Sequence, residues 1–134
     1  MGIVVGMKQL TLKVLDGHYA IHRFSPQSDI PAEVLGSSLL SITKTEEELS
    51  IVCDTSISLD ADETESGWSG IQVLGPLDFS LTGILAKLSG ILAEADISIF
   101  AISTYDTDYI LVKEKMLQLA VSTLQKKEGI ICHE

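Results

Sequence analysis

The sequence predicts an α+β protein made of two related halves, and three observations support this. In residues 70–134, strand-like and helix-like segments follow the order β-α-β-β-α-β, the ferredoxin-like arrangement. A stretch of the first half repeats the pattern of the second, and a run of acidic residues separates them. We therefore expect an N-terminal half at residues 1–62 and a C-terminal half at residues 63–134, each with an antiparallel sheet backed by helices.

The C-terminal half shows its elements most clearly. Residues 70–74 form a short strand-like run, and apolar residues then recur at steps of three and four from Leu81 to Ala95, which predicts a helix. Gly83 and Gly90 weaken this helix by about 1 kcal/mol each relative to Ala, and close packing against a sheet would explain them. The other expected elements are strands at 97–104, 109–112 and 130–131, a polar turn at 105–108, and a helix at 113–127 ended by Gly129.

The N-terminal half resembles a reduced copy of this pattern. Residues 38–53 align without gaps on residues 98–113 at an offset of 60, with apolar residues matching apolar residues and one acidic turn matching the other. A strong two-residue turn signal, Asp16-Gly17, predicts a β-hairpin. The remaining expectations for this half are hairpin strands at 10–15 and 18–24, a short helix at 28–35, no long helix, and a solvated acidic linker at 60–65.

Composition excludes several classes of function. The net charge of −10 and the absence of a basic stripe argue against nucleic-acid binding. The apolar runs are too short to span a membrane, and residues 1–7 are too short for a signal peptide, so we expect a cytoplasmic protein. Cys53 and Cys132 fit no zinc spacing; Cys53 has the setting of a small core residue, and a disulfide is not expected.

Residues that could carry catalysis are scattered. His18 and His22 lie four apart on a predicted strand, which places them roughly 13 Å apart and too far to share a metal ion. No GxSxG, HExxH or P-loop pattern occurs. We therefore expect no enzyme, no metal and no cofactor.

The turn from the first strand of the C-terminal half into its helix is the best candidate for a binding site. Glycine at position 75 lets the backbone approach a ligand closely, and the amides of residues 79–81 could donate to a carboxylate at the positive end of the helix dipole. Asp78 has two possible roles: it could bind an ammonium group, or it could cap the helix. Ser80 is a second candidate for the helix cap.

The segment from Gly75 to Val112 resembles the ACT domain, through its glycine turn, its helix, its Ile-Ser-Ile strand and its Ser-Thr-Tyr-Asp-Thr-Asp-Tyr turn. It is most similar to short bacterial tandem-ACT proteins related to the regulatory end of aspartate kinases, and also to the ACT module of cytosolic arginine sensors. Residues 19–53 resemble the N-terminal ACT half of such proteins. The resemblance implies two ACT units side by side, usual homodimerisation, and a regulatory role toward a partner protein.

The resemblance also implies an amino acid ligand, held where ACT units meet. In that arrangement the loop amides take the carboxylate of the ligand and Asp78 takes its ammonium group. The positions carried over are the loop residues Gly75, Pro76, Leu77, Asp78, Phe79, Ser80 and Leu81, and the facing strand residues Ile99, Phe100, Ala101 and Ile102.

Two hypotheses about the function of the chain compete. In the first, the chain is an amino-acid-binding regulatory module. In the second, it is an assembly module whose ACT faces pair without a small molecule, which predicts covered strand edges and no polar groups converging near Asp78.

Overall fold

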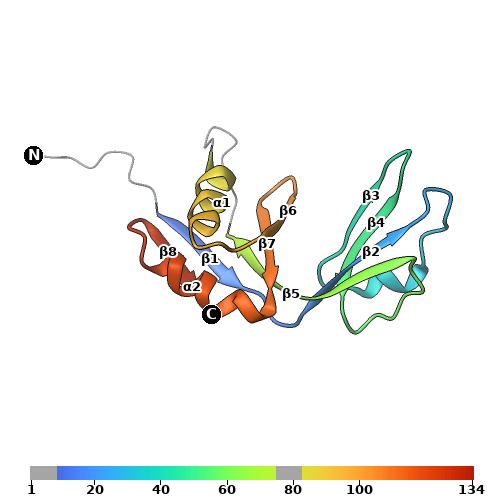
Figure 1. Ribbon diagram of the computed structural model, residues 1–134, viewed down its shortest axis with the longest axis horizontal. Coiled ribbons are helices and arrows are strands. Elements are labelled where there is room, and N and C mark those ends of the chain that lie inside the picture. The colour runs from blue at the N-terminus through green and yellow to red at the C-terminus, as the bar shows by residue number, and fades with distance from the viewer. Residues whose placement is uncertain (1–8, 75–82) are drawn as a thin grey trace, which may run out of the picture. The chain divides into compact units, whose positions relative to one another are not determined.

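The computed structural model describes residues 9–74 and 83–134 (Figure 1). Among these residues, no helix is long and apolar enough to cross a membrane. The strands are β1 (Leu10–Val14), β2 (Tyr19–Phe24), β3 (Ser41–Lys44), β4 (Leu49–Asp54), β5 (Glu63–Val73), β6 (Ile99–Ser103), β7 (Asp108–Lys113) and β8 (Ile130–His133). The helices are α1 (Ile84–Glu94) and α2 (Leu117–Gln125), with short 3-10 helices η1 (Ala32–Gly36) and η2 (Glu114–Met116).

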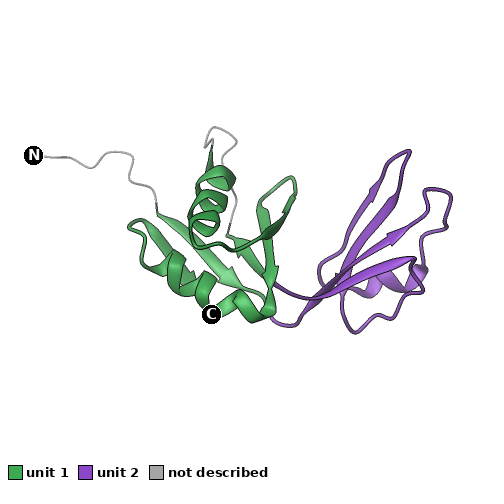
Figure 2. Cartoon of the chain, viewed as in Figure 1, with its two compact units in different colours: residues 1–15, 70–134 green, residues 16–69 purple. Residues whose placement is uncertain are grey.

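The chain forms two compact units, and the first contains residues 1–15 and 70–134 (Figure 2). Its strands lie in the order β6-β7-β5-β1-β8. The expected β-α-β-β-α-β order is therefore present, as β5, α1, β6, β7, α2 and β8. An additional strand, β1, lies between β5 and β8, antiparallel to β5 and parallel to β8. This pairing draws β1 into the first unit, so the units differ from the expected halves 1–62 and 63–134.

The core of the first unit lies between its sheet and its helices. Buried residues of the sheet, of α1 and of α2 form one cluster. Helix α1 contributes Leu88 and Leu92, and α2 contributes Val121 and Leu124. Cys132 of β8 belongs to the same cluster, which its sequence position did not indicate. The helical period of the sequence identified these faces correctly because three- and four-residue steps place side chains on one side of a helix.

The second unit contains residues 16–69, and its antiparallel sheet has the order β3-β4-β2-β5. The expected short helix is the 3-10 helix η1, which begins after Pro31 and buries Val34. A small core of Phe24, Val34, Leu49, Ile51 and Cys53 joins η1 to the sheet. The expectations that this half lacks a long helix and that Cys53 is a core residue are confirmed.

The predicted hairpin at Asp16-Gly17 is wrong. Strands β1 and β2 do not pair with each other; each pairs antiparallel with a different stretch of β5. A tight two-residue turn of type I′ needs a positive φ at both positions. Gly17 has φ 83°, but Asp96 is the one non-glycine residue with positive φ in the described part of the chain, so Asp16 does not meet this requirement.

The acidic linker is also shorter than expected, because β5 already begins at Glu63. In this strand Glu63 and Glu65 alternate with Thr64, whose hydroxyl bonds to His22 in the neighbouring strand. Charged residues at every second position of a strand can remain in solvent while the backbone is paired. The acidic composition of residues 60–65 therefore predicted a linker where the chain already forms the start of β5.

The internal repeat is confirmed, with its register corrected by one residue. The β3–β4 and β6–β7 hairpins each have a four-residue loop. Thr45 and Thr104 take the same place in these loops, since each amide donates to the carbonyl three residues on. The offset between the two hairpins is therefore 59 residues rather than 60. At this offset the three consecutive buried residues of β4 also align with the three consecutive buried residues of β7.

Close packing does not explain the two glycines of the first helix. Gly83 precedes α1 with φ 80°, a left-handed conformation that glycine adopts without steric cost. A Cβ added at Gly90 would meet nothing within 4 Å, so no neighbour requires glycine there. The helix begins at Ile84, and the proposed caps Asp78 and Ser80 lie outside the described residues.

Candidate functional site

The described residues nearest the predicted binding loop are held by one buried hydroxyl. Thr107, which is 6% exposed, donates its side-chain hydroxyl to the carbonyl of Val73 at the end of β5. The Thr107 amide donates to the hydroxyl of Thr104 at 3.2 Å, and that hydroxyl donates to the Thr107 carbonyl at 3.0 Å. The β6–β7 turn is thereby attached to the strand from which the predicted loop departs.

Both ends of the predicted loop are fixed by backbone bonds. On one side, the amide of Leu74 donates to the Thr11 carbonyl at 2.8 Å. On the other, the carbonyl of Gly83 accepts the amide of Lys87 at 2.8 Å in the first turn of α1. The seven predicted contact residues 75–81 lie between these anchors and outside the described residues. Their role as ligand contacts stays a prediction.

The four predicted residues of the facing strand all lie in β6, but they divide between the two faces of its sheet. Ile99 and Ala101 are paired with core residues of β7 and share the face that the helices cover. Phe100 and Ile102 alternate with them and point to the opposite face. One ligand lying on either face would therefore contact two of these side chains, rather than four.

His22, Cys53 and Cys132 are buried structural residues in this arrangement. His22 is 4% exposed, and its Nδ1 lies 2.8 Å from the hydroxyl of Thr64. Burial lowers the pKa of the His22 imidazole and raises the pKa of the Cys53 and Cys132 thiols. A raised pKa disfavours the reactive thiolate. Within residues 9–74 and 83–134, no group of three His, Cys, Asp or Glu side chains could hold a metal ion.

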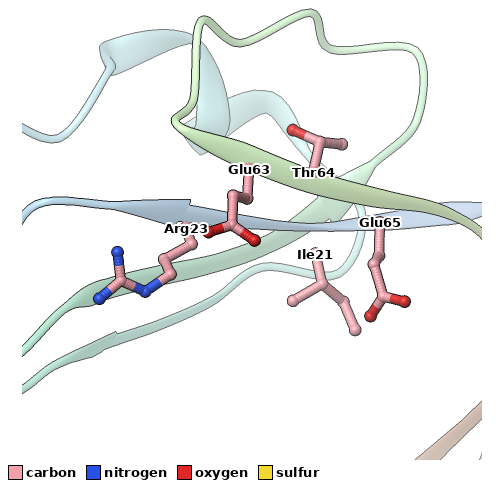
Figure 3. Close-up of a pocket in the computed structure, with 5 residues that line it drawn as sticks. All are labelled: Ile21, Arg23, Glu63, Thr64 and Glu65. Carbon is pink, nitrogen blue, oxygen red and sulfur yellow. The ribbon is translucent and has the colours of Figure 1, made fainter.

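Sequence reasoning missed a shallow pocket in the second unit, lined by Ile21, Arg23, Glu63, Thr64 and Glu65 (Figure 3). These residues come from two strands about forty positions apart, and the pairing of β2 with β5 brings them together. Because residues 60–65 were interpreted as a linker, the sequence offered no reason to place Glu63 beside Arg23.

Comparison with known proteins defines the class. Residues 63–126 match the sequence model of the ACT domain, and residues 17–60 match a second model, described as an N-terminal domain. The β-α-β-β-α-β order and the paired hairpins agree with this match. Residues 63–126 therefore form an ACT domain.

Its similarities to individual proteins extend over different lengths. An Agobacterium tumefaciens protein of known crystal structure is 36% identical, with a TM-score of 0.84 covering 94% of this chain and 97% of that one. A structure of aspartokinase alpha and beta subunits, 18% identical with a TM-score of 0.62, covers 88% of this chain and 97% of that chain and shows the shared fold. The human cytosolic arginine sensor for mTORC1 subunit 1 is 39% identical over 62 residues, which are 46% of this chain and 19% of the sensor.

Proposed function

We propose that this protein is a regulatory module that binds an amino acid where two ACT units meet. The observation that carries the proposal is the ACT match over residues 63–126, combined with the anchoring of the loop ends by Thr107 and Gly83. A loop that joins the end of a strand to the start of a helix presents backbone amides to an anion. The similarity to a protein named as an arginine sensor supports an amino acid as the ligand.

The chemistry of the loop suits a zwitterion. Amides of residues 79–81 would donate to the carboxylate, and Asp78 would accept the ammonium group. On β6, Ile99 and Ala101, or Phe100 and Ile102, would contact the side chain of the ligand, according to the face it occupies. We further propose that the chain acts as a homodimer on a partner protein in the cytoplasm, with no catalytic step of its own.

A thermal-shift screen of the standard amino acids at millimolar concentration tests this proposal. A ligand at ten times its Kd stabilises the native state by about 1.4 kcal/mol, which raises the Tm by several degrees. Asp78→Asn should abolish the shift, whereas Asp60→Asn, which removes the same charge from an exposed position, should preserve it. No shift with any amino acid would contradict the proposal.

One observation favours the alternative of an assembly module without a ligand. Strand β6 pairs with β7 alone among residues 9–74 and 83–134, and a strand at the edge of a sheet can pair with a strand of another chain. Analytical ultracentrifugation of the protein distinguishes the two functions. A stable dimer with no thermal response to amino acids would favour assembly, while a dimer strengthened by one amino acid would favour sensing.

A further inference from the structure

Helix α2 has an exposed side as well as the side that packs in the core of the first unit. Leu119 is 46% exposed on this helix, whereas three other residues of the helix are buried. Exposed Lys115 precedes Leu119 by four residues, and exposed Lys126 follows it by seven. This spacing places the three side chains on one side of a helical segment. They form the α2 face, in which one apolar side chain lies between two cations.

The second unit has an exposed surface of the opposite charge. Leu35 of η1 is 76% exposed, and Ile30, which precedes this helix, is 50% exposed. Residues 57–61 pack against the same small core as η1, so both segments cover one side of the sheet. Glu33 and Asp60 lie in these two segments and are exposed. The four residues named individually here form the η1 surface, which combines apolar side chains with carboxylates.

The charge of the chain is divided unequally between the two units. The second unit contains eleven acidic and two basic residues, and the first contains eight acidic and seven basic residues, so their net charges are −9 and −1. Two copies that met through their second units would bring like charges together. A first unit that meets a second unit places the lysines of the α2 face against the carboxylates of the η1 surface. Charge complementarity therefore favours a second copy of the chain as the occupant of the α2 face.

From these surfaces we infer that the α2 face of one copy docks on the η1 surface of a second copy. Leu119 packs against Leu35 and Ile30, and the two lysines of the α2 face lie beside the two carboxylates of the η1 surface. The contact removes exposed apolar side chains from water, and its charges select the partner surface. A two-fold axis makes this contact twice and closes the assembly as a dimer. The inference rests on the homodimer of the proposed function and names the surfaces that join it.

Reversal of the charges tests the contact, with the dimer Kd measured by sedimentation equilibrium over a micromolar concentration series. The double variants Lys115→Glu/Lys126→Glu and Glu33→Lys/Asp60→Lys should each weaken the dimer by at least about tenfold, because each brings like charges together at both contacts. The second variant is the sharper test. It makes an acidic chain less negative, so overall repulsion alone would strengthen its association.

An equimolar mixture of these two variants tests whether the contact joins two copies. In a mixed dimer, one contact carries the exchanged charges and the other carries the original charges, so opposite charges meet at both. The mixture should therefore dimerise within about threefold of the wild type. Native mass spectrometry with one variant isotope-labelled identifies the mixed dimer. A mixture that stays as weakly associated as its components would overturn the inference.

Matched controls change the same charges at exposed positions outside both surfaces. Lys13→Glu/Lys44→Glu and Glu46→Lys/Glu94→Lys should each change the dimer Kd by less than about threefold. If these controls weaken the dimer as much as the charge reversals within the two surfaces, the contact is refuted.

The apolar part of the contact has its own test. Leu119→Ser should weaken the dimer by about fivefold or more, because it removes the side chain that the η1 surface covers. Ile131→Ser is the matched control, since Ile131 is 37% exposed on β8 and lies outside both surfaces. Equal dimer Kd values for these two variants would contradict the packing of Leu119.

Thermal-shift measurements with amino acids on the same proteins separate this inference from the proposed function. Charge reversals that leave the dimer unchanged would refute the contact and leave amino acid binding standing. A restored mixed dimer without any thermal shift would support the contact and contradict the proposed function. A wild-type protein that sediments as a monomer throughout the series would refute the inference.

Discussion

Replacing Thr107 by valine removes the hydroxyl that attaches the β6–β7 turn to the end of β5 and almost preserves the side-chain shape. Because Thr107 is 6% exposed, the Val73 carbonyl loses its donor in a place with little access to water. The loss of such a buried hydrogen bond destabilises a protein by about 1–3 kcal/mol. Each kcal/mol lowers the Tm of a chain of this size by about 3–6 °C.

Urea unfolding followed by circular dichroism measures this change, and Thr107→Ser is the matched variant. Serine keeps the hydroxyl and loses only a methyl group, so it should retain most of the stability that valine loses. We also expect faster hydrogen exchange of the Leu74 amide in Thr107→Val, because this amide donates to Thr11 immediately beyond Val73. If the valine variant is as stable as the serine variant, the hydroxyl does not attach the turn and the reasoning fails.

Three further predictions concern stability. Gly90→Ala should raise the free energy of unfolding by about 0.5–1 kcal/mol, because the added Cβ meets no neighbour. Gly83→Ala should lower it, because alanine is strained at the φ of 80° that Gly83 adopts. Chemical denaturation of both variants checks the difference in sign. Because burial lowers the pKa of His22, the unfolded state binds more protons than the folded state, and the free energy of unfolding should fall as the pH drops below about 6.5. In a denaturation series from pH 7.5 to 5, the free energy of unfolding should change less with pH in His22→Phe than in the wild type. Burial raises the pKa of Asp54, but hydrogen bonds led by the amide and hydroxyl of Ser38 outweigh it and hold the pKa low. The stabilisation should therefore be present at neutral pH and lost in acid, and Asp54→Asn should remove this acid dependence.

Elements whose signals are local could be predicted from the sequence. The apolar period of the second helix and the β-branched runs at 97–112 gave correct elements, since each depends on side chains a few residues apart. The repeat between the two hairpins was also visible, although its register was off by one residue because the alignment compared letters and not the hydrogen bonds of the loops.

Strand pairing over long distances could not be predicted. The signal at Asp16-Gly17 suggested a hairpin, but β5 is long enough to pair with β1 and β2 in turn, and no local pattern shows that it reaches back to residue 63. The insertion of β1 beside β8 is a contact between residues about 120 positions apart. Such pairings depend on which edges remain available in the folded sheet.

The candidate loop site was identified by combining helix-terminus chemistry with a family resemblance, and the structure adds its anchors. Thr107 was part of the recognised turn, yet its bond to Val73 depends on the pairing of β7 with β5 and could not be inferred from the turn alone. The pocket at Arg23 was missed for a related reason, because its acidic residues were assigned to a linker.

Hydrogen-exchange mass spectrometry, with and without the amino acid that gives the greatest thermal shift, measures directly whether an amino acid binds at the loop of residues 75–82. We predict slower exchange in peptides covering residues 75–82 and in those covering β6, and a loss of this protection in Asp78→Asn. Exchange that stays unchanged at residues 75–82 under saturating amino acid would contradict binding at that loop.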